Sequence, residues 1–261
     1  MNHIPKIPRA EDAPRPFRGP PFGGPPYRQP PTREPMFTIP GSVLAMAAIL
    51  SVIHIIRGTL SFHDDLTVLA WFAFIPARFT SEWAGLPGGI AADVWTFFTY
   101  AGLHGSTMHL VTNVIWMVAF GSAVARRFGA WRFWLFSLVT AAGGAGAHLF
   151  VHWGDTVPVV GASAAISGQM AAAARFVFDE YGPLSFRFGG EAARYKRPAR
   201  NLADTLSNKR ALTFIIIWFA VNLIVGVGSS VAGGVSIAWE AHLGGFVVGL
   251  LAFRLFDPVP R

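Results

Sequence analysis

The chain has 261 residues, of which 52% are hydrophobic and only 13% are charged, and its formal net charge is +7. Soluble domains carry roughly 25% charged residues, so this composition indicates a protein whose main surroundings are lipid. The sequence contains no cysteine, which excludes disulfides, thiol catalysis and thiolate metal sites.

The N-terminal segment, residues 1–40, differs in composition from the rest of the chain. It holds 12 of the 19 prolines and six Lys or Arg residues. Such a segment has too little apolar surface to form a core, so we expect a disordered, Pro/Arg-rich tail with polyproline II character. No apolar run follows the first basic residues, which argues against a signal peptide. Residues 41–256 are expected to form one membrane domain.

Six apolar segments follow the tail, at residues 41–56, 105–122, 132–151, 163–178, 212–231 and 238–255. Most of them reach the roughly 17–25 residues that a spanning helix needs. The predicted fold class is therefore all-α, a polytopic membrane protein built as a six-transmembrane-helix bundle.

Two long connections separate these segments. The first, residues 57–104, contains "LTVLAWFAFIPARF", whose apolar run before Pro76 is too short to cross a bilayer. This pattern predicts an interfacial or re-entrant segment. The second, residues 179–211, is polar and basic and is predicted to be a water-facing loop.

The positive charges indicate how the chain is oriented. An even number of spans puts both termini on one side, and 19 of the 21 Lys and Arg residues then lie on that side, with Arg57 and Arg78 opposite. The positive-inside rule assigns the basic side, and hence both termini, to the cytoplasm. The basic residues are accounted for by the membrane topology, so no nucleic acid partner is expected. The expected partner of the membrane domain is the lipid bilayer.

Polar residues near the starts of three segments are predicted to converge. The second, fourth and sixth segments all enter from the non-cytoplasmic side, and their polar residues are His104, His109 and Asn113, then Ser163 and Ser167, then His242. Each could instead serve as a hydrogen-bonding contact between helices. His242, Gly245 and Gly249 are spaced i, i+3, i+7, and the two glycines permit close approach of the fourth segment.

These residues could carry nucleophilic chemistry. Neutral imidazole can activate a serine hydroxyl, and His242 is the candidate base for Ser163. His109 and Asn113 share a helical face and could donate to an oxyanion. The interpretation is a Ser-His dyad, because the membrane segments are expected to contribute no Asp or Glu to the site and Glu240 is expected on another side of its helix from His242.

Two other chemistries fit these residues less well. A metal at His104, His109 and His242 would have no carboxylate or cysteine ligand, so neither a metal nor a cofactor is expected. The absence of intramembrane acids also argues against an ion-coupled transporter.

The motifs resemble those of the rhomboid family of intramembrane serine proteases, over about residues 68–255. The resemblance rests on three motifs in order: His104, His109 and Asn113 as H-x4-H-x3-N; Gly161, Ala162 and Ser163 as G-x-S; and Ala241, His242, Gly245 and Gly249 as A-H-x-x-G-x-x-x-G. The sequence departs from the family at Ala164, usually Gly, and at Ser167, often an aromatic that stacks on the histidine.

The resemblance implies a six-helix core with a membrane-embedded first loop. It implies that Ser163 is the nucleophile, His242 the general base, and His109, Asn113 and the Ser163 N–H the oxyanion site. His104, Gly161, Gly245 and Gly249 would have supporting roles.

The predicted function is therefore hydrolysis of peptide bonds in or near transmembrane segments of membrane proteins, in a bacterial inner membrane and without a cofactor. Two alternatives remain open: a catalytically silent rhomboid-like protein that binds membrane clients, and a small-solute transporter or channel. Nothing in the sequence sets the oligomeric state.

Overall fold

The computed structural model describes residues 39–80, 85–184, 194–231 and 238–260. These residues belong to one compact unit within Ile39–Arg261. The predicted tail, apart from its last two residues, lies outside the described residues. Within them the secondary structure is helical, and the extended pairing is one isolated antiparallel bridge between Phe74 and Val159.

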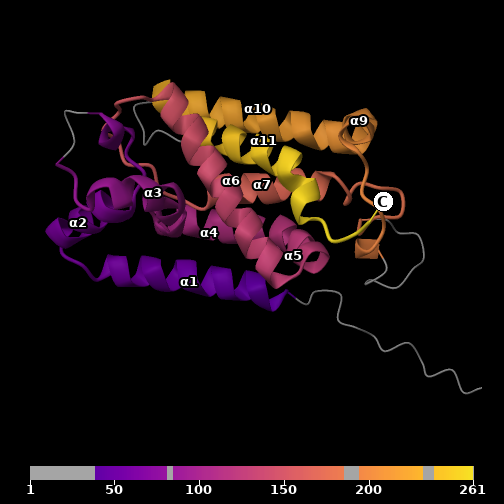
Figure 1. Cartoon of the computed structure of the whole chain (residues 1–261), viewed down its shortest axis with the longest axis horizontal. Helices are drawn as coiled ribbons and strands as arrows, with labels where there is room; N and C mark the ends of the chain where they lie inside the picture. The colour runs from indigo at the N-terminus through magenta and orange to yellow at the C-terminus, as the bar shows by residue number, and fades with distance from the viewer. Residues whose placement is uncertain (1–38, 81–84, 185–193, 232–237, 261) are drawn as a thin grey trace, which may run out of the picture. The chain divides into compact units, whose positions relative to one another are not determined.

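Five helical segments are long and apolar enough to cross a membrane. They are α1 (Gly41–Gly58), the continuous run of α4, η5 and α5 (Thr107–Phe128), α6 (Ala130–Val151), α10 (Lys209–Val231, of which Lys209–Gly226 qualifies) and α11 (Trp239–Phe256). In Figure 1, α1 begins and α11 ends on the same side of the unit. The chain is thus an all-helical integral membrane protein.

The remaining helices are short. They are α2 (Phe62–Phe72), η2 (Pro76–Phe79), α3 (Gly89–Thr99), η4 (Tyr100–Gly102), α7 (Ser163–Ala174) and α9 (Leu202–Ser207). The apolar run predicted to be interfacial or re-entrant thus forms most of α2 and continues into η2. The basic connection 179–211 contains α9 and the first turn of α10.

Two predicted spans differ from the observed helices. The second was expected to end near residue 122, but the helix continues through a π-helical turn, Met117–Gly121, to Phe128. Arg126 and Arg127 therefore lie on this helix. The guanidinium of Arg127 is buried, and its charge is compensated by Asp257 at an N–O distance of 2.8 Å.

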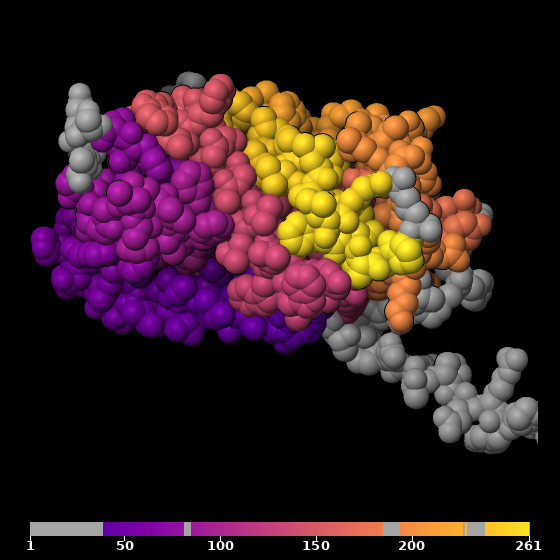
Figure 2. Space-filling view, in the orientation of Figure 1, coloured from indigo at the N-terminus to yellow at the C-terminus, as the bar shows by residue number. Residues whose placement is uncertain are grey.

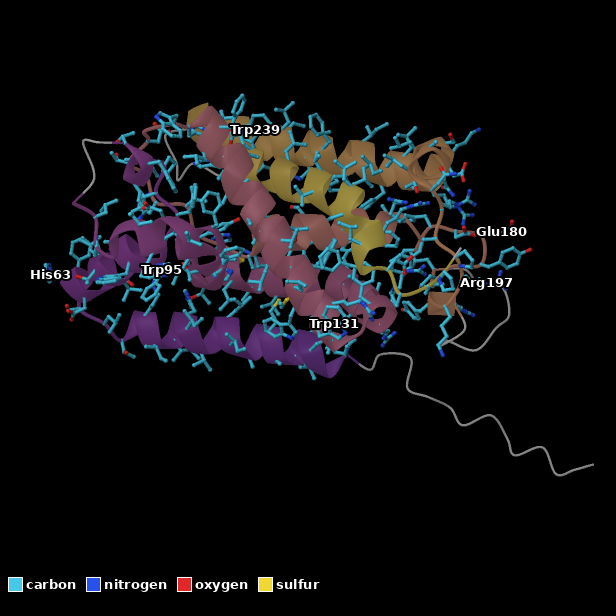
Figure 3. All side chains as sticks on the ribbon, in the orientation of Figure 1. His63, Trp95, Trp131, Glu180, Arg197 and Trp239 are labelled. Carbon is cyan, nitrogen blue, oxygen red and sulfur yellow. The ribbon has the colours of Figure 1, made fainter. Side chains whose placement is uncertain are left out.

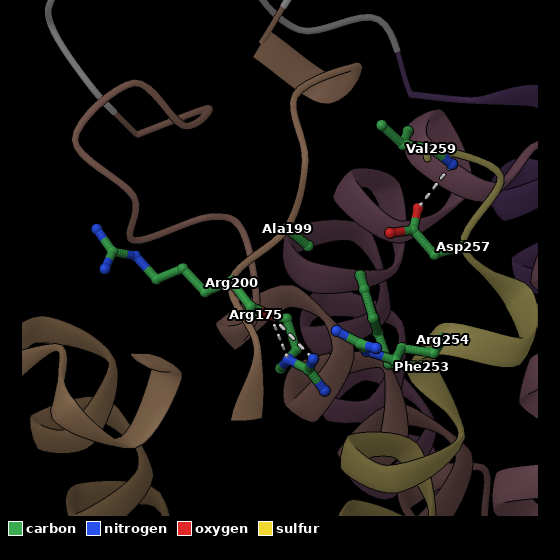
Figure 4. Close-up of a pocket in the computed structure, with 7 residues that line it drawn as sticks. All are labelled: Arg175, Ala199, Arg200, Phe253, Arg254, Asp257 and Val259. Carbon is green, nitrogen blue, oxygen red and sulfur yellow. Dashed lines mark hydrogen bonds between the residues drawn. The ribbon is translucent and has the colours of Figure 1, made fainter. Parts of the chain in front are cut away.

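The fourth span was expected to reach residue 178, but α7 ends at Ala174. Just beyond that end, Arg175 turns its guanidinium onto the main-chain oxygens of Arg200 and Leu250. Figure 4 shows this arginine in a pocket bounded by Phe253, Arg254 and Asp257. A buried guanidinium needs such acceptors, and these contacts fasten the end of α7 to α11 and to the basic connection.

Helix α7 lies in the centre of the unit. Every residue from Ala164 to Ala174 is buried, whereas α1 and α10 each carry exposed Ile, Leu and Val side chains along their length. An apolar exterior around a buried central helix is the arrangement that lipid surroundings favour.

Small residues allow the central helices to pack closely. A Cβ atom added at Gly249 of α11 would lie 2.5 Å from the Cα atom of Gly168 in α7, and one added at Gly245 would collide with the Ala164 carbonyl. On the other side of α11, a Cβ atom added at Gly244 would meet Ala147 of α6. Figure 2 shows the surfaces of α6 and α11 in contact on the face in view. Helix α11 therefore packs closely against α7 through its glycines, as the sequence predicts.

Candidate functional site

The loop before α7 positions Ser163, the first residue of that helix. Its main chain is held by the Phe74–Val159 bridge and by a hydrogen bond of 3.0 Å from the Gly161 N–H to the Tyr100 carbonyl. Gly161 has φ +126°, and a Cβ atom there would lie 2.8 Å from His109 Nε2. A side chain at residue 161 would therefore be strained and would strike the His109 ring.

Ser163 and His242 are within hydrogen-bonding distance. The Ser163 Oγ atom lies 2.7 Å from His242 Nε2 although the two residues are 79 positions apart. Both side chains are partly exposed. His242 occupies the first turns of α11, three residues before Gly245, so the close packing of α11 on α7 brings the imidazole to the serine.

The other ring nitrogen of His242 contacts Asn222, a residue of α10 that the sequence analysis did not identify. The Nδ1 atom of His242 lies 2.6 Å from Asn222 Oδ1, and Asn222 Nδ2 donates to the Trp218 carbonyl at 2.9 Å. Because that carbonyl can only accept, the amide oxygen faces the imidazole and Nδ1 carries the proton. Nε2 is then free to accept from Ser163. The signal in the sequence was an amide in an otherwise apolar stretch.

His109 and Asn113 lie four residues apart, one turn from each other, in α4. The ring of His109 lies against Gly161, two residues before Ser163. Asn113 is buried, and its Nδ2 donates to the His109 carbonyl at 2.9 Å. An amide nitrogen has two hydrogens, so Asn113 retains a second donor. The pair shares the helical face that the sequence indicated.

His104 lies just before α4, as the predicted segment 105–122 implies, although the helix itself begins two residues later, at Thr107. Its ring is buried and contacts the His109 ring, with centroids 5.2 Å apart. Burial, together with the neighbouring His109 and His54, lowers the pKa of His104 to about 4. The ring is therefore neutral at pH 7 and supports His109 by packing.

The residues at the two departures from the family motif are both buried. Ala164 lies beneath Gly245, and Ser167 donates its hydroxyl to the Ser163 carbonyl at 2.8 Å. Ser167 thus bonds to its own helix. Beyond its contacts with Ser163 and Asn222, His242 is held by the fit of α11 against α7.

The prediction that the membrane segments contain no Asp or Glu is wrong for Glu240. It lies in the first turn of α11, which is a candidate span, and its carboxylate contacts His148 and His152 of the α6 end. Among the described residues, these three form the group whose ligand atoms could hold a metal, and His104, His109 and His242 do not form one.

These contacts describe a helical membrane protein in which a serine hydroxyl, an imidazole and an amide are connected by hydrogen bonds. The serine and the imidazole lie near the starts of α7 and α11, and the amide lies in the middle of α10. The sequence matches the family model described as the Rhomboid domain over residues 91–257. That match covers more than half of the chain, and the chain belongs to the rhomboid family.

Several relatives carry the name rhomboid protease GlpG. The chain is 24% identical over 188 residues to the protein of Photorhabdus laumondii, covering 72% of this chain and 56% of the relative. It is 26% identical over 215 residues to that of an Enterobacter species, covering 81% and 61%. For Yersinia pestis the identity is 24% over 210 residues, covering 80% and 59%. The matched region is thus less than two thirds of each relative's length.

Proposed function

We propose that this protein is an intramembrane serine protease that hydrolyses peptide bonds in or near transmembrane segments of other membrane proteins. The observation that carries the proposal is the 2.7 Å contact between Ser163 Oγ and His242 Nε2, with Nδ1 committed to Asn222. An imidazole held in this tautomer has its basic nitrogen directed at the hydroxyl, which is the arrangement that general-base activation of serine requires.

The chemistry follows from these contacts. His242 Nε2 takes the proton of Ser163 as Oγ attacks the carbonyl carbon of the scissile bond. When the tetrahedral intermediate collapses, the imidazolium gives that proton to the departing amine, and an ester to Ser163 remains. Water, deprotonated by the same imidazole, then cleaves the ester and restores the hydroxyl. No cofactor enters these steps.

The negative charge of the intermediate needs donors. We assign this role to His109, to the second amide hydrogen of Asn113 and to the Ser163 main-chain N–H at the start of α7. Support comes from the position of the His109 ring, which lies against Gly161 beside the serine. Donors fixed before reaction stabilise the oxyanion without a reorganisation cost.

The length of α7 supports cleavage within the membrane. Its 12 residues span about 18 Å, whereas the hydrocarbon core is about 30 Å thick. A central helix of this length that ends near the basic side begins below the opposite surface, and Ser163 is its first residue. We therefore propose that α7 is the fourth of six crossings and that water reaches Ser163 through a cavity among α4, α7 and α11.

The same reasoning extends to the rest of the fold and to the location of the chain. We propose that α2, η2 and α3 belong to a membrane-embedded first loop, supported by the Phe74–Val159 bridge between this connection and the loop before Ser163. We also propose the inner membrane of a bacterium, since the relatives above are bacterial. Both termini would be cytoplasmic. The proposed partners are transmembrane protein substrates and the lipid bilayer.

A serine-directed fluorophosphonate probe tests the proposed function. The purified full chain in detergent should be labelled at Ser163, and Ser163→Ala and His242→Ala should be neither labelled nor active against a panel of single-pass membrane proteins. Ser207→Ala is the matched control, because Ser207 is an exposed serine at the end of α9 and should leave labelling intact. Full proteolysis by Ser163→Ala would exclude this mechanism, and a folded wild type without labelling or cleavage would favour the catalytically silent, client-binding alternative.

A further inference from the structure

A second cluster of ionisable side chains joins the end of α6 to the start of α11. His148 and His152 are four residues apart, so they share one side of the helix end, and their rings stack with centroids 4.4 Å apart. Glu240 faces them from α11: its Oε1 atom lies 3.2 Å from His152 Nε2, and its Oε2 atom lies 3.8 Å from His148 Nδ1. In Figure 3 the neighbouring Trp239 marks the start of α11 beside the end of α6.

The spacing of these atoms suits a metal ion. Ligands bound to zinc at about 2.0–2.1 Å in tetrahedral geometry lie about 3.3 Å from one another. The separations of 3.2 Å from His152 to Glu240 Oε1 and of 3.8 Å from His148 to Glu240 Oε2 lie on either side of that value. With one ligand atom taken from each residue, all three atoms lie within 4.8 Å of one another. Small side-chain rotations would therefore bring them to a common ion.

The Nδ1 atom of His148 also indicates a bound ligand. His148 is 7% exposed, and its Nδ1 atom is buried without a hydrogen-bond partner. An ion pair between His152 and Glu240 would leave this nitrogen unsatisfied, which is costly for a buried polar atom. A metal ion between the two helices would satisfy it.

Asp155 supplies the outer contact that a metal-bound histidine commonly has. Its Oδ2 atom lies 2.8 Å from His152 Nδ1, on the opposite side of the ring from Glu240. A carboxylate in that position fixes the Nδ1–H tautomer and directs the Nε2 lone pair towards the ion. Asp155 and His152 are 54% and 32% exposed in their side chains, so the site has an entry path from solvent.

We propose that His148, His152 and Glu240 form a binding site for a divalent transition-metal ion of the zinc type. Two imidazoles and one carboxylate favour such an ion over Mg²⁺ or Ca²⁺, which prefer oxygen ligands alone. The bound ion ties the end of α6 to the first turn of α11, two residues before His242. The inference stands on this cluster alone and does not depend on protease activity.

Zinc binding to the purified full chain, prepared without a polyhistidine tag, tests the site. Calorimetry with Zn²⁺ should give one ion per chain, and saturation at about 100 times Kd should raise Tm by about 5–10 °C. Co²⁺ should give a visible absorption band, and Mg²⁺ should give neither effect. The variants His152→Gln and Glu240→Gln should each weaken binding at least about tenfold, and Asp155→Asn should weaken it about 10- to 100-fold.

His63→Gln is the matched control, because His63 is an exposed histidine of α2 next to two acidic residues. It should leave zinc affinity and the Tm shift unchanged. His148→Gln removes a buried ring and could impair folding. The decisive variants are therefore His152→Gln, at a more exposed residue, and Glu240→Gln, in the first turn of α11. Absence of zinc binding by the folded wild type, or wild-type affinity in both of these variants, would overturn the proposal.

Discussion

The Nδ1 atom of His242 lies 2.6 Å from the Oδ1 atom of Asn222, which joins the start of α11 to the middle of α10. The amide cannot rotate freely, because its nitrogen donates to Trp218 within the same helix. Asn222 therefore orients the imidazole that faces Ser163, in the position that a carboxylate occupies in a Ser-His-Asp triad. We regard it as a positioning residue, since it acts through His242.

Replacing Asn222 tests this relationship. Asn222→Leu should lower kcat up to about 100-fold, because an imidazole displaced by about 1 Å loses its alignment with Ser163. Asn222→Asp keeps the accepting oxygen and should retain more activity, with a shifted pH profile of kcat. A purely structural amide would show no such rescue and no shift. Asn201→Ala, which removes an amide that caps α9, is the control.

The assignment of Asn113 to the oxyanion site makes a kinetic prediction. Asn113→Ala removes one donor while His109 and the Ser163 N–H remain, and such losses typically cost about 10²–10³ in rate. Turnover of a membrane substrate should fall by that amount, while fluorophosphonate labelling slows without being abolished. An unchanged kcat would assign Asn113 to packing within α4, where its amide already donates to the His109 carbonyl.

Gly245 should be more important for activity than for folding. A Cβ atom at this position would strike the carbonyl of Ala164, the residue after Ser163, so Gly245→Ala must move α11 away from α7. Overpacking costs about 1–3 kcal/mol, which the bundle can survive, but the Ser163–His242 hydrogen bond cannot lengthen by much. We expect a small loss of Tm and a loss of at least about tenfold in kcat.

Gly146 offers the matched control for that substitution. It lies in α6, and a Cβ atom there would have no neighbour within 4 Å. Gly146→Ala should leave both Tm and kcat near the wild-type values. Equal activity in Gly245→Ala and Gly146→Ala would mean that the contact with α7 does not hold His242 in place.

Topology can be measured directly. The charge distribution predicts that a reporter fused after Arg261 is cytoplasmic. It also predicts that a tag inserted within residues 226–236, of which 232–236 lie outside the described residues, is accessible from outside. Figure 3 shows Glu180 and Arg197 at the opposite side of the unit from His63, as two water-facing ends require. An external C-terminus would contradict the proposed orientation, and Ser163 would then open towards the cytoplasm.

The sequence by itself determined the helical membrane class of the fold and pointed to the residues that we propose for catalysis. Apolar segments of sufficient length predicted the helices because a bilayer requires every backbone polar group to be paired within its own segment. Parity then brought His109, Ser163 and His242 to one side without any knowledge of packing. Glycine spacing predicted the approach of α11 to α7, since a missing side chain can be read directly from the sequence.

Only the tertiary structure decided which polar groups meet. Asn222 was overlooked because it lies in the middle of a span and its partner is 20 residues away on another helix. The sequence placed Glu240 on another side of its helix from His242. It could not show that Glu240 contacts His148 and His152, because those contacts depend on how α6 crosses α11. Local periodicity describes one helix face at a time. The rotation of one helix against another is set by side-chain packing across the whole interface.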